Sequence, residues 1–358
     1  MPTFVIDSAA LSRNMEKQRR FTSAQIIAVV KGNGYGLGLV PYARFLTAQG
    51  VALLAVSTVE EAAALRDAGI TAQLLMLSST ALPEEIAALL ARDVILTVGS
   101  ADAARAVSDA AAARGVTARV HVKLDTGMGR YGFLPQETAE AAALLQALPA
   151  LRVEGVFTHL SDAANAKCTA LQYRRFTEGV RILQEAGIDT GLRHVCASTA
   201  FLRYPEMHLD AVRLGSALLG RLSVPDTLGL ERIGWLEAQV TELPAGWPVG
   251  YTGAYRTRRE TRLALLPVGY TSGVGVTEET NALRLRDRLR RVLHAGRRLL
   301  RADGMTVLVN GCRCPVRGVV GATAIEADVT DVPCAVGDTV RIEVRPKFVD
   351  SAVPREYR

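Results

Sequence analysis

The sequence predicts an α/β fold in which an N-terminal (β/α)8 barrel is followed by a mostly β C-terminal domain. Up to about residue 222, eight apolar runs of strand length alternate with longer, Ala-rich helical patterns. Beyond that point, short strand-like runs are separated by turns rich in Gly, Pro and Asp. Regular alternation of strands and helices favours a parallel barrel. We therefore expect residues 1–222 to form the barrel and residues 223–358 the β domain, with the first few residues as a candidate addition to the latter.

The individual elements are expected from apolar periodicity and from turn and cap residues. The expected barrel strands are 26–30, 51–56, 72–77, 94–98, 118–124, 153–157, 193–196 and 210–214. The expected strands of the β domain are 237–243, 261–266, 306–309, 316–320 and 339–344. Thr58 is expected to cap a helix, with Glu61 as its capping-box partner. Pro83 is expected to open another helix, and residues 169–186 to form a third.

Composition argues against several classes of protein. With 49% hydrophobic and 22% charged residues, the chain can bury a sizeable core. The net charge of +6 is concentrated partly in the Arg-rich run 284–291, which is more typical of a solvated helix than of a nucleic-acid site. No apolar run is long enough to span a bilayer, and residues 1–7 do not resemble a signal peptide. The five scattered cysteines fit a reducing compartment, so we expect a cytoplasmic protein. From the charge pattern and the lack of a long apolar run, we expect no nucleic-acid and no membrane partner.

Lys31 is the first candidate for chemistry. It follows the apolar run 26–30, which places it at the carboxyl end of the first expected strand, the face on which barrel active sites lie. The glycine-rich turn 32–38 comes directly after it. This order differs from a phosphate-binding P-loop, in which the lysine follows the glycines. A lysine at a strand end is otherwise an ordinary exposed charge, so position alone does not assign a role.

Residues 28–38, Ala-Val-Val-Lys-Gly-Asn-Gly-Tyr-Gly-Leu-Gly, closely resemble the cofactor-attachment segment of the alanine racemase family, whose members use pyridoxal 5′-phosphate (PLP). The resemblance implies that Lys31 carries PLP as a Schiff base and that the Tyr35 hydroxyl contacts the cofactor phosphate. A lysine amine is the group that forms such a bond, and a phenol can donate to phosphate without adding a full charge.

The run 121–130, His-Val-Lys-Leu-Asp-Thr-Gly-Met-Gly-Arg, leaves the fifth expected strand and resembles a second family motif. The resemblance implies that Arg130 lies beside the cofactor ring oxygen and the substrate. It also implies that Lys123 supports this arginine, and Lys123 is a candidate for the carboxylation found in several members. A surface salt bridge is the alternative for both residues.

The ends of the last three expected strands resemble the family in the same order. The resemblance implies that His159 orients a catalytic tyrosine and that Ser198 binds phosphate, although Ala197 stands where asparagine is usual. It further implies that Arg213 faces the pyridine nitrogen and that the N–H groups of Gly215 and Ser216 complete the phosphate site. Because arginine keeps its proton, the pyridine nitrogen should stay unprotonated, which suits racemisation better than transamination.

The segment 249–255 in the β domain resembles the family segment that carries the second base, here Tyr251. Racemisation removes a proton from one face of the α-carbon and returns one to the other, and Lys31 with Tyr251 would serve the two faces. In the family this tyrosine comes from a partner subunit, which implies a homodimer with composite active sites. Tyr270, in the run 266–270, would line the substrate entrance. A buried structural tyrosine is the alternative for Tyr251.

The substrate loop departs from the family pattern. The family has a Cys-Met-Asp segment that binds the substrate carboxylate largely through main-chain amides, whereas this chain has Gly321-Ala322-Thr323. Ala322 can supply an amide, and its smaller side chain should enlarge or reshape the pocket, which makes substrates other than alanine the alternative to alanine. Near the C-terminus, Ser351 and Tyr357 are both candidates for a last phosphate contact.

The leading hypothesis is an isomerase that interconverts L- and D-alanine and supplies D-alanine for peptidoglycan. A broad-specificity or basic amino-acid racemase of the same fold is the alternative. A related decarboxylase would need a carboxylate where Arg213 stands. A non-catalytic PLP-binding protein would lack the β domain with Tyr251, and a nucleic-acid-binding module rests only on the arginine run.

Overall fold

The described residues form two compact units. The computed structural model describes the chain except residues 245–255, 258, 278–288, 290–291, 294–295 and 297–303. One unit comprises residues Ala9–Ile233, and the other combines Met1–Ser8 with Gly234–Arg358. The expected boundary at residue 222 thus falls inside the first unit. The reason is that the backbone of Glu231 is hydrogen-bonded to Asn14, a residue of the same unit.

The first unit is a barrel of eight parallel strands in the order β8-β7-β6-β5-β4-β3-β2-β9. Its strands are β2 (Gln25–Val29), β3 (Leu53–Val56), β4 (Gln73–Ser79), β5 (Val94–Val98), β6 (Ala118–Lys123), β7 (Leu151–Phe157), β8 (Leu192–His194) and β9 (Ala211–Leu214). The region that follows β8 is connected to β9 by two contacts. Ala197 and Arg213 form a parallel bridge, and the Arg213 N–H donates to Cys196 O at 2.9 Å. The sheet is therefore a nearly closed barrel, as the alternation of strands and helices predicts.

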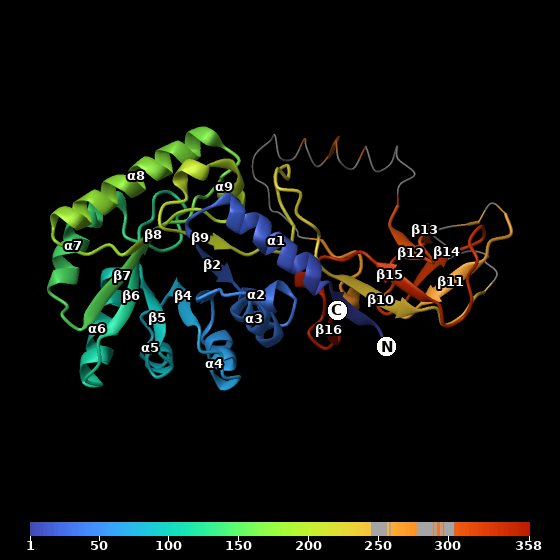
Figure 1. Cartoon of the computed structure of the whole chain (residues 1–358), viewed down its shortest axis with the longest axis horizontal. Helices are drawn as coiled ribbons and strands as arrows, with labels where there is room; N and C mark the ends of the chain where they lie inside the picture. The colour runs from blue at the N-terminus through green and yellow to red at the C-terminus, as the bar shows by residue number, and fades with distance from the viewer. Residues whose placement is uncertain (245–255, 258, 278–288, 290–291, 294–295, 297–303) are drawn as a thin grey trace. The chain divides into compact units, whose positions relative to one another are not determined.

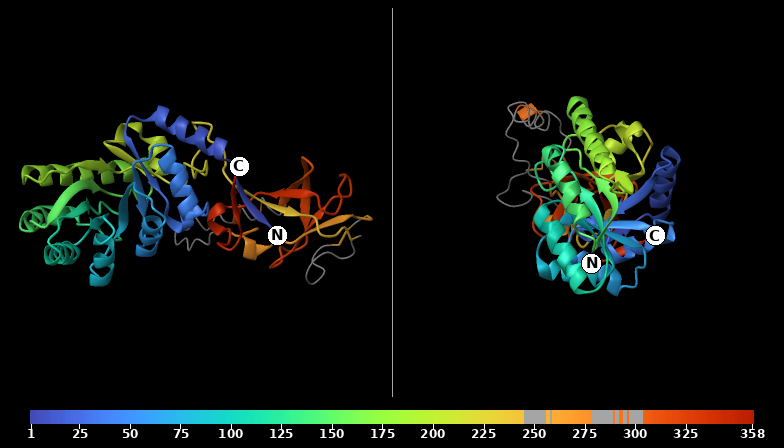
Figure 2. Two further views of the ribbon diagram at one scale, coloured as in Figure 1. Left: turned by 60° about the horizontal axis from the view of Figure 1, so that its bottom comes forward. Right: turned by 90° about the vertical axis from the view of Figure 1, so that its left-hand side faces the viewer.

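The helices lie outside the strands, as the two views of Figure 2 and the view of Figure 1 show. They are α1 (Ser8–Phe21), α2 (Lys31–Tyr35), α3 (Leu39–Ala48), α4 (Val59–Asp67), α5 (Pro83–Leu90), α6 (Ala101–Ala113), α7 (Thr138–Gln146), α8 (Ala166–Glu185) and α9 (Ser198–Arg203), with 3-10 turns η1 (Pro135–Glu137) and η2 (Pro205–Met207). Among the residues that the structure places, no helix combines the length and the apolar character needed to cross a membrane.

Apolar side chains from neighbouring strands fill the barrel. Ile27 and Val29 on β2, like Leu53 and Ala55 on β3, alternate along their strands and belong to one buried cluster. Alternate residues of a strand point to the same side, so these side chains meet in the interior. Each fully buried aliphatic side chain of this kind contributes about 2 kcal/mol of hydrophobic stabilisation. This packing fixes the strand ends, and with them the residues that follow each strand.

The capping prediction at α4 is half right. Thr58 Oγ1 accepts from the Glu61 N–H at 3.2 Å, which confirms the N-cap. The expected return bond from Glu61 is wrong, because its carboxylate accepts the N–H of Gly32 (2.6 Å) and of Ser57 (2.9 Å) instead. The Glu61 carboxylate therefore binds one backbone N–H after β2 and one after β3.

The second unit is a sheet of eight strands in the order β11-β14-β13-β12-β15-β10-β1-β16, antiparallel except for the parallel pair β1 and β16. Its strands are β1 (Thr3–Ile6), β10 (Trp235–Gln239), β11 (Leu263–Leu266), β12 (Thr306–Val309), β13 (Cys312–Arg317), β14 (Ile325–Asp328), β15 (Thr339–Ile342) and β16 (Arg355–Tyr357), with 3-10 turns η4 (Tyr270–Ser272) and η5 (Pro346–Phe348). The expected strand at 316–320 is misplaced. Gly318, with φ of +72°, follows the end of β13.

Candidate active site

A pocket of about 660 Å³ opens among residues at the carboxyl ends of the barrel strands. Residues that the sequence analysis singled out line it together: Lys31, Tyr35, Lys123, Arg130, His159, Ser198, Arg213, Gly215 and Ser216. Four of these carry a cationic group, whereas the lining includes one acidic side chain, Asp162. The excess of positive charge favours a ligand that carries negative charge.

The turn after Lys31 explains its glycines. Gly32, Asn33, Gly34 and Tyr35 all have φ between +54° and +64°, so α2 is a left-handed turn. A left-handed conformation is sterically costly for residues with a Cβ, and two glycines reduce that cost. The bond from Gly32 N–H to the Glu61 carboxylate (2.6 Å) holds the turn from the side of α4. Lys31 is thereby fixed at the strand end from which it enters the pocket.

The Lys31 amine lies in a cationic environment. Desolvation by the pocket walls, and next the positive charge of Arg130, lower the pKa of Lys31, while Glu61 opposes them. The residue remains accessible to solvent in the open pocket. A lysine with a lowered pKa has more of its amine in the neutral, nucleophilic form. Lys31 is therefore suited to bond covalently to a carbonyl group of a ligand.

Arg213, on β9, is the most extensively bound side chain of the site. It is 3% exposed and donates to the carbonyl oxygens of Thr158 (2.7 Å), His194 (2.8 Å) and Val195 (3.2 Å). Within the described part of the chain, no carboxylate forms an ion pair with it. Burial lowers the pKa of Arg213 to about 10, so the guanidinium stays protonated at neutral pH. Among the described residues, the Arg213 guanidinium is thus a fixed positive charge in the pocket without a carboxylate partner.

Two further histidines, which the sequence analysis did not assign, continue from Arg213 into the barrel. Arg213 Nη1 donates to His194 Nδ1 at 2.6 Å, and His194 Nε2 lies 2.9 Å from His121 Nδ1. Because arginine can only donate, Nδ1 of His194 must be the acceptor, and the ring proton lies on Nε2. His194 Nε2–H then donates a hydrogen bond to His121 Nδ1. Burial, and next the Arg213 charge, lower the pKa of His121 to about 3 and that of His194 well below its ordinary value. Both rings are therefore neutral, in defined tautomers.

His159 lies at the other side of the guanidinium. Its Nδ1 is 3.5 Å from Arg213 Nη2, at the outer limit of a hydrogen bond. Burial, followed by the charges of Arg213 and Arg130, lowers the pKa of His159 to about 3. With Nδ1 facing a donor, the ring proton sits on Nε2. His159 can then donate that proton to an oxygen atom of another group in the pocket.

A single carboxylate organises the loop that ends in Arg130. Asp125 accepts four backbone N–H bonds, from Gly127, Met128, Gly129 and Arg130, at 2.7–3.0 Å. Burial opposes ionisation of Asp125, but the N–H bonds from the loop outweigh it and keep the pKa of this carboxyl below its ordinary value. No role for Asp125 was predicted from the sequence, although an Asp-x-Gly turn is a recognised setting for such bonds.

Lys123 differs from Lys31 in being completely buried, at 0% exposure. Its Nζ donates to the Tyr131 carbonyl and lies 4.7 Å from the centre of the Tyr131 ring. Burial lowers the pKa of Lys123 to about 8, although nearby Asp125 opposes this. A substantial share of this amine is therefore neutral near physiological pH.

The other end of the pocket presents hydroxyl and N–H groups. Ser198 Oγ accepts from the N–H of Ala217 at 3.1 Å and of Gly215 at 3.4 Å. A Cβ on Gly215 would lie 2.5 Å from the Tyr35 hydroxyl, so glycine is required for the two to lie side by side. Within the described residues, the Ser216 N–H has no acceptor. A backbone N–H and hydroxyls gathered in this way are typical of a phosphate site.

The remaining expected site residues belong to the second unit or lie outside the described residues. Tyr270 is 55% exposed, and its N–H donates to Gly321 O at 3.0 Å. Ala322 O accepts from the N–H of Thr271 at 3.1 Å, so the two expected substrate-binding segments are neighbours. Tyr251 belongs to residues 245–255, which lie outside the described residues. Most of the arginine run 284–291 also lies outside them.

Several lining residues carried no motif in the sequence. Ser57 and Ser78 lie at the ends of β3 and β4, and Tyr131 follows Arg130 directly. Thr199 Oγ1 and Ser223 Oγ, 2.9 Å apart, complete one wall. Ser57 and Ser78 could have been predicted from their positions at strand ends. Ser223 could not, because it lies in a loop that has no strand pattern.

Fold and pocket together define a barrel enzyme whose strand ends hold an accessible lysine, a buried arginine and a turn that lines the pocket at Gly215 and Ser216. Comparison with known proteins agrees: the family of the alanine racemase N-terminal domain matches residues 6–223, and that of the alanine racemase C-terminal domain matches residues 237–348. The chain belongs to the alanine racemase family.

Individual relatives match along nearly the whole chain. The alanine racemase of Desulfovibrio desulfuricans is 35% identical over 346 residues, covering 94% of this chain and 87% of the relative. The structure of alanine racemase from Clostridium difficile 630 superimposes with a TM-score of 0.86 at 26% identity, covering 100% of this chain and 95% of the other. A Bacillus anthracis alanine racemase structure with bound L-Ala-P gives a TM-score of 0.81 at 28% identity, with coverage of 100% and 95%.

Proposed function

We propose that this protein is a PLP-dependent racemase that interconverts L- and D-alanine. The observation that carries the proposal is the joint placement of Lys31, Arg213 and the Gly215–Ser216 turn in one pocket of a chain whose relatives are alanine racemases. A non-catalytic PLP-binding protein is a weaker alternative, because the match to the alanine racemase C-terminal domain covers residues 237–348.

The residues present fit PLP. Its phosphate would be held by Tyr35, Ser198 and the N–H groups of Gly215 and Ser216, where the Ser216 N–H has no acceptor among the described residues. Its carbonyl carbon would bond to the Lys31 amine, whose pKa is lowered by desolvation and by Arg130. The excess of cationic groups around the pocket would balance the negative charge of the phosphate. Bound PLP would withdraw electrons from the substrate α-carbon and so acidify its hydrogen.

Arg213 and His159 would moderate the electron withdrawal that bound PLP supplies. Arg213 would face the pyridine nitrogen with a proton that it does not release, since its pKa remains at about 10. With Arg213 in this place, bound PLP would keep its ring nitrogen unprotonated and would be a weaker electron acceptor. His159, neutral and protonated on Nε2, would donate to the oxygen of the Tyr251 phenol.

Two groups would move the proton. The Lys31 amine takes or returns it on one face of the α-carbon, and the Tyr251 phenol does so on the other. We infer that Tyr251 reaches the pocket from a second copy of the chain, which gives a homodimer with composite sites. This part of the proposal rests on the similarity of segment 249–255 to the family.

Arg130 and Lys123 would hold the substrate side of the cofactor. The Asp125 carboxylate fixes the loop that ends in Arg130. Neutral amines add CO₂ and release one proton, and the lowered pKa of Lys123, about 8, makes that form accessible. A carboxylated Lys123 would place a negative charge near Arg130 in an otherwise cationic region. We propose this modification on those grounds.

Substrate choice depends on the loop 321–323. Tyr270 and Ala322, in neighbouring segments, would line the entrance, and the small Ala322 side chain leaves more room than the methionine usual in the family. A racemase that accepts amino acids larger than alanine is therefore the second candidate function. Both candidate functions would use the same barrel residues. They differ in the size of the amino acid that the loop 321–323 would admit.

Turnover of separate L-amino acids tests the proposal. We expect purified protein with added PLP to convert L-alanine to a racemic mixture, as measured by chiral chromatography at increasing times. Starting from D-alanine should reach the same end point, because the free energies of enantiomers are equal. Conversion of a larger amino acid at a higher kcat/KM than alanine would favour the second candidate. Absence of inversion for every amino acid would contradict both.

A further inference from the structure

Helix α1 places two buried amide side chains against the turn that follows β9. Asn14 and Gln18, four residues apart, lie on one face of the helix, and each is 0% exposed. Neither belongs to a motif that the sequence analysis used. Buried amides are costly unless they are hydrogen-bonded, so their partners indicate what they hold in place.

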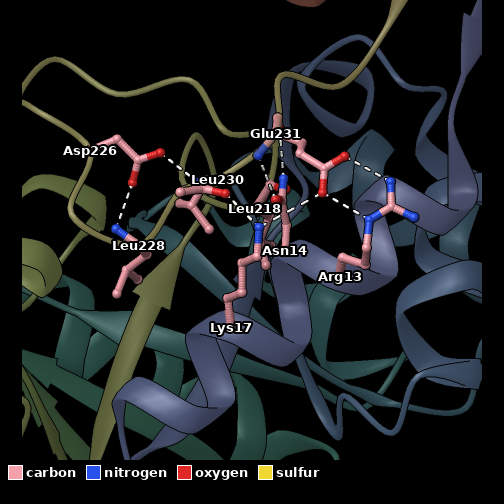
Figure 3. A network of polar contacts seen from close by, with 9 residues as sticks. Arg13, Asn14, Lys17, Leu218, Asp226, Leu228, Leu230 and Glu231 are labelled. Carbon is pink, nitrogen blue, oxygen red and sulfur yellow. Dashed lines mark hydrogen bonds and ion pairs between the residues drawn. The ribbon is translucent and has the colours of Figure 1, made fainter.

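Asn14 joins the two ends of one loop, as Figure 3 shows. Its Nδ2 donates to Leu218 O (3.1 Å) and to Glu231 O (2.7 Å), and its Oδ1 accepts from Glu231 N–H (2.8 Å). The loop 219–230, which carries Ser223 to the pocket wall, therefore begins and ends at this one side chain. Without Asn14, one buried backbone group, Leu218 O, and two half-buried ones, the N–H and C=O of Glu231, would lose a partner.

Gln18 contacts the adjacent peptide of the same turn. Its Nε2 donates to Ala217 O at 2.7 Å, whereas its Oε1 is buried without a partner among the described residues. An unpaired buried oxygen makes this residue a poor choice for stability alone. The bond to Ala217 is thus the main polar contact that the side chain gives to the fold.

The carbonyls that these amides bind belong to the turn that lines the pocket. Leu218 N–H bonds to Gly215 O (3.1 Å), Leu219 N–H to Ser216 O (3.2 Å), and Ala217 N–H to Ser198 Oγ (3.1 Å). Fixing the carbonyls of residues 217 and 218 from outside fixes the peptide planes of the turn. The Ser216 N–H, which belongs to the same pocket-lining turn and has no acceptor among the described residues, then keeps a fixed orientation.

We propose that Asn14 and Gln18 are positioning residues for phosphate binding, and that they act through the orientation of the Gly215–Ser216 turn. Because this assignment rests on the proposed PLP site, it concerns how tightly the phosphate of the cofactor is held. Arg13 and Lys17, on the same helix, form exposed contacts at the end of the same loop, with the Glu231 carboxylate and with Gly229 O. Exposed ion pairs of this kind contribute little to stability.

The test compares PLP with pyridoxal, which has the same aldehyde but no phosphate. Dissociation constants of both are measured by equilibrium dialysis for wild type, Asn14→Ala, Gln18→Met and Lys17→Met. We expect the ratio of the two constants, pyridoxal over PLP, to fall about tenfold or more in Asn14→Ala, the loss of one charge-assisted bond to phosphate. Gln18→Met should lower it in the same direction, and Lys17→Met should leave it unchanged.

Gln18→Met keeps the test decisive if Asn14→Ala folds poorly, because methionine fills the same volume and removes the unpaired oxygen. A merely structural role would weaken PLP and pyridoxal equally, and an unchanged ratio in Gln18→Met would overturn the assignment. Failure of the proposed function looks different: wild type itself would then bind PLP no more tightly than pyridoxal.

Discussion

Lys31→Ala is expected to lower kcat for alanine racemisation by about four to six orders of magnitude, the scale seen when an enzyme loses a covalent catalytic group. The residue would serve both as the cofactor attachment and as a base, and its alanine variant lacks both functions. Lys123, the other lysine of the pocket, cannot replace it. It is fully buried, and its amine is bound to the Tyr131 carbonyl. Initial rates from L- and D-alanine measure the loss.

Borohydride reduction and peptide mapping identify the attachment residue independently of activity. Wild type treated with PLP should yield a pyridoxyl group on the peptide that contains Lys31, and Lys31→Ala should yield none. Lys167→Ala, at an exposed position in α8, serves as the control and should behave as wild type. A label on the Lys123 peptide of wild type would refute the assignment of Lys31.

Arg213→Met should lower the free energy of unfolding by about 3–5 kcal/mol, the cost of breaking a buried charged hydrogen-bond network. The guanidinium donates to three carbonyls and to His194 Nδ1, and methionine leaves all four acceptors buried without this donor. The free energy of unfolding of Arg213→Lys should lie between those of wild type and Arg213→Met, because an ammonium restores the charge but not the planar set of donors. Urea unfolding of the PLP-saturated protein measures the difference.

Arg181→Met is the matched control for Arg213. Arg181 on α8 pairs with Glu178 and Glu185, but its side chain is 53% exposed, so its removal should cost no more than about 1 kcal/mol. Equal stability of the two methionine variants would show that the buried network contributes nothing beyond a surface pair. Loss of racemisation in Arg213→Met alone is expected in addition.

The barrel was predictable because its strands are buried on both faces. Runs such as 94–98 are continuous and apolar, and β5 has the expected bounds, Val94–Val98. The β domain was less predictable, since β1 and β16 pair across almost the whole length of the chain. Short half-buried strands lack a strong local signal, and pairing between distant segments leaves none in either one.

The pocket residues that follow strands were predictable, whereas those that support them were not. Lys31 and Arg213 lie at or just after strand ends, and periodicity locates them. Glu61 shows the limit of local reasoning: its position relative to Thr58 predicted a capping box, but Gly32, 29 residues away in sequence, offers its N–H instead. Asn14 and His194 likewise act through distant partners. Only the assembled fold brings such pairs together.

The most direct test of the two-sided proton transfer follows Tyr251→Phe in ²H₂O. Loss of the α-hydrogen is measured by proton NMR and inversion by chiral chromatography, separately from L- and D-alanine, with Tyr255→Phe as a control. We predict that the variant still exchanges the α-hydrogen of the enantiomer that faces Lys31, while its inversion of either enantiomer is slowed by about a hundredfold or more. Inversion by Tyr251→Phe at the wild-type rate would contradict the two-base account.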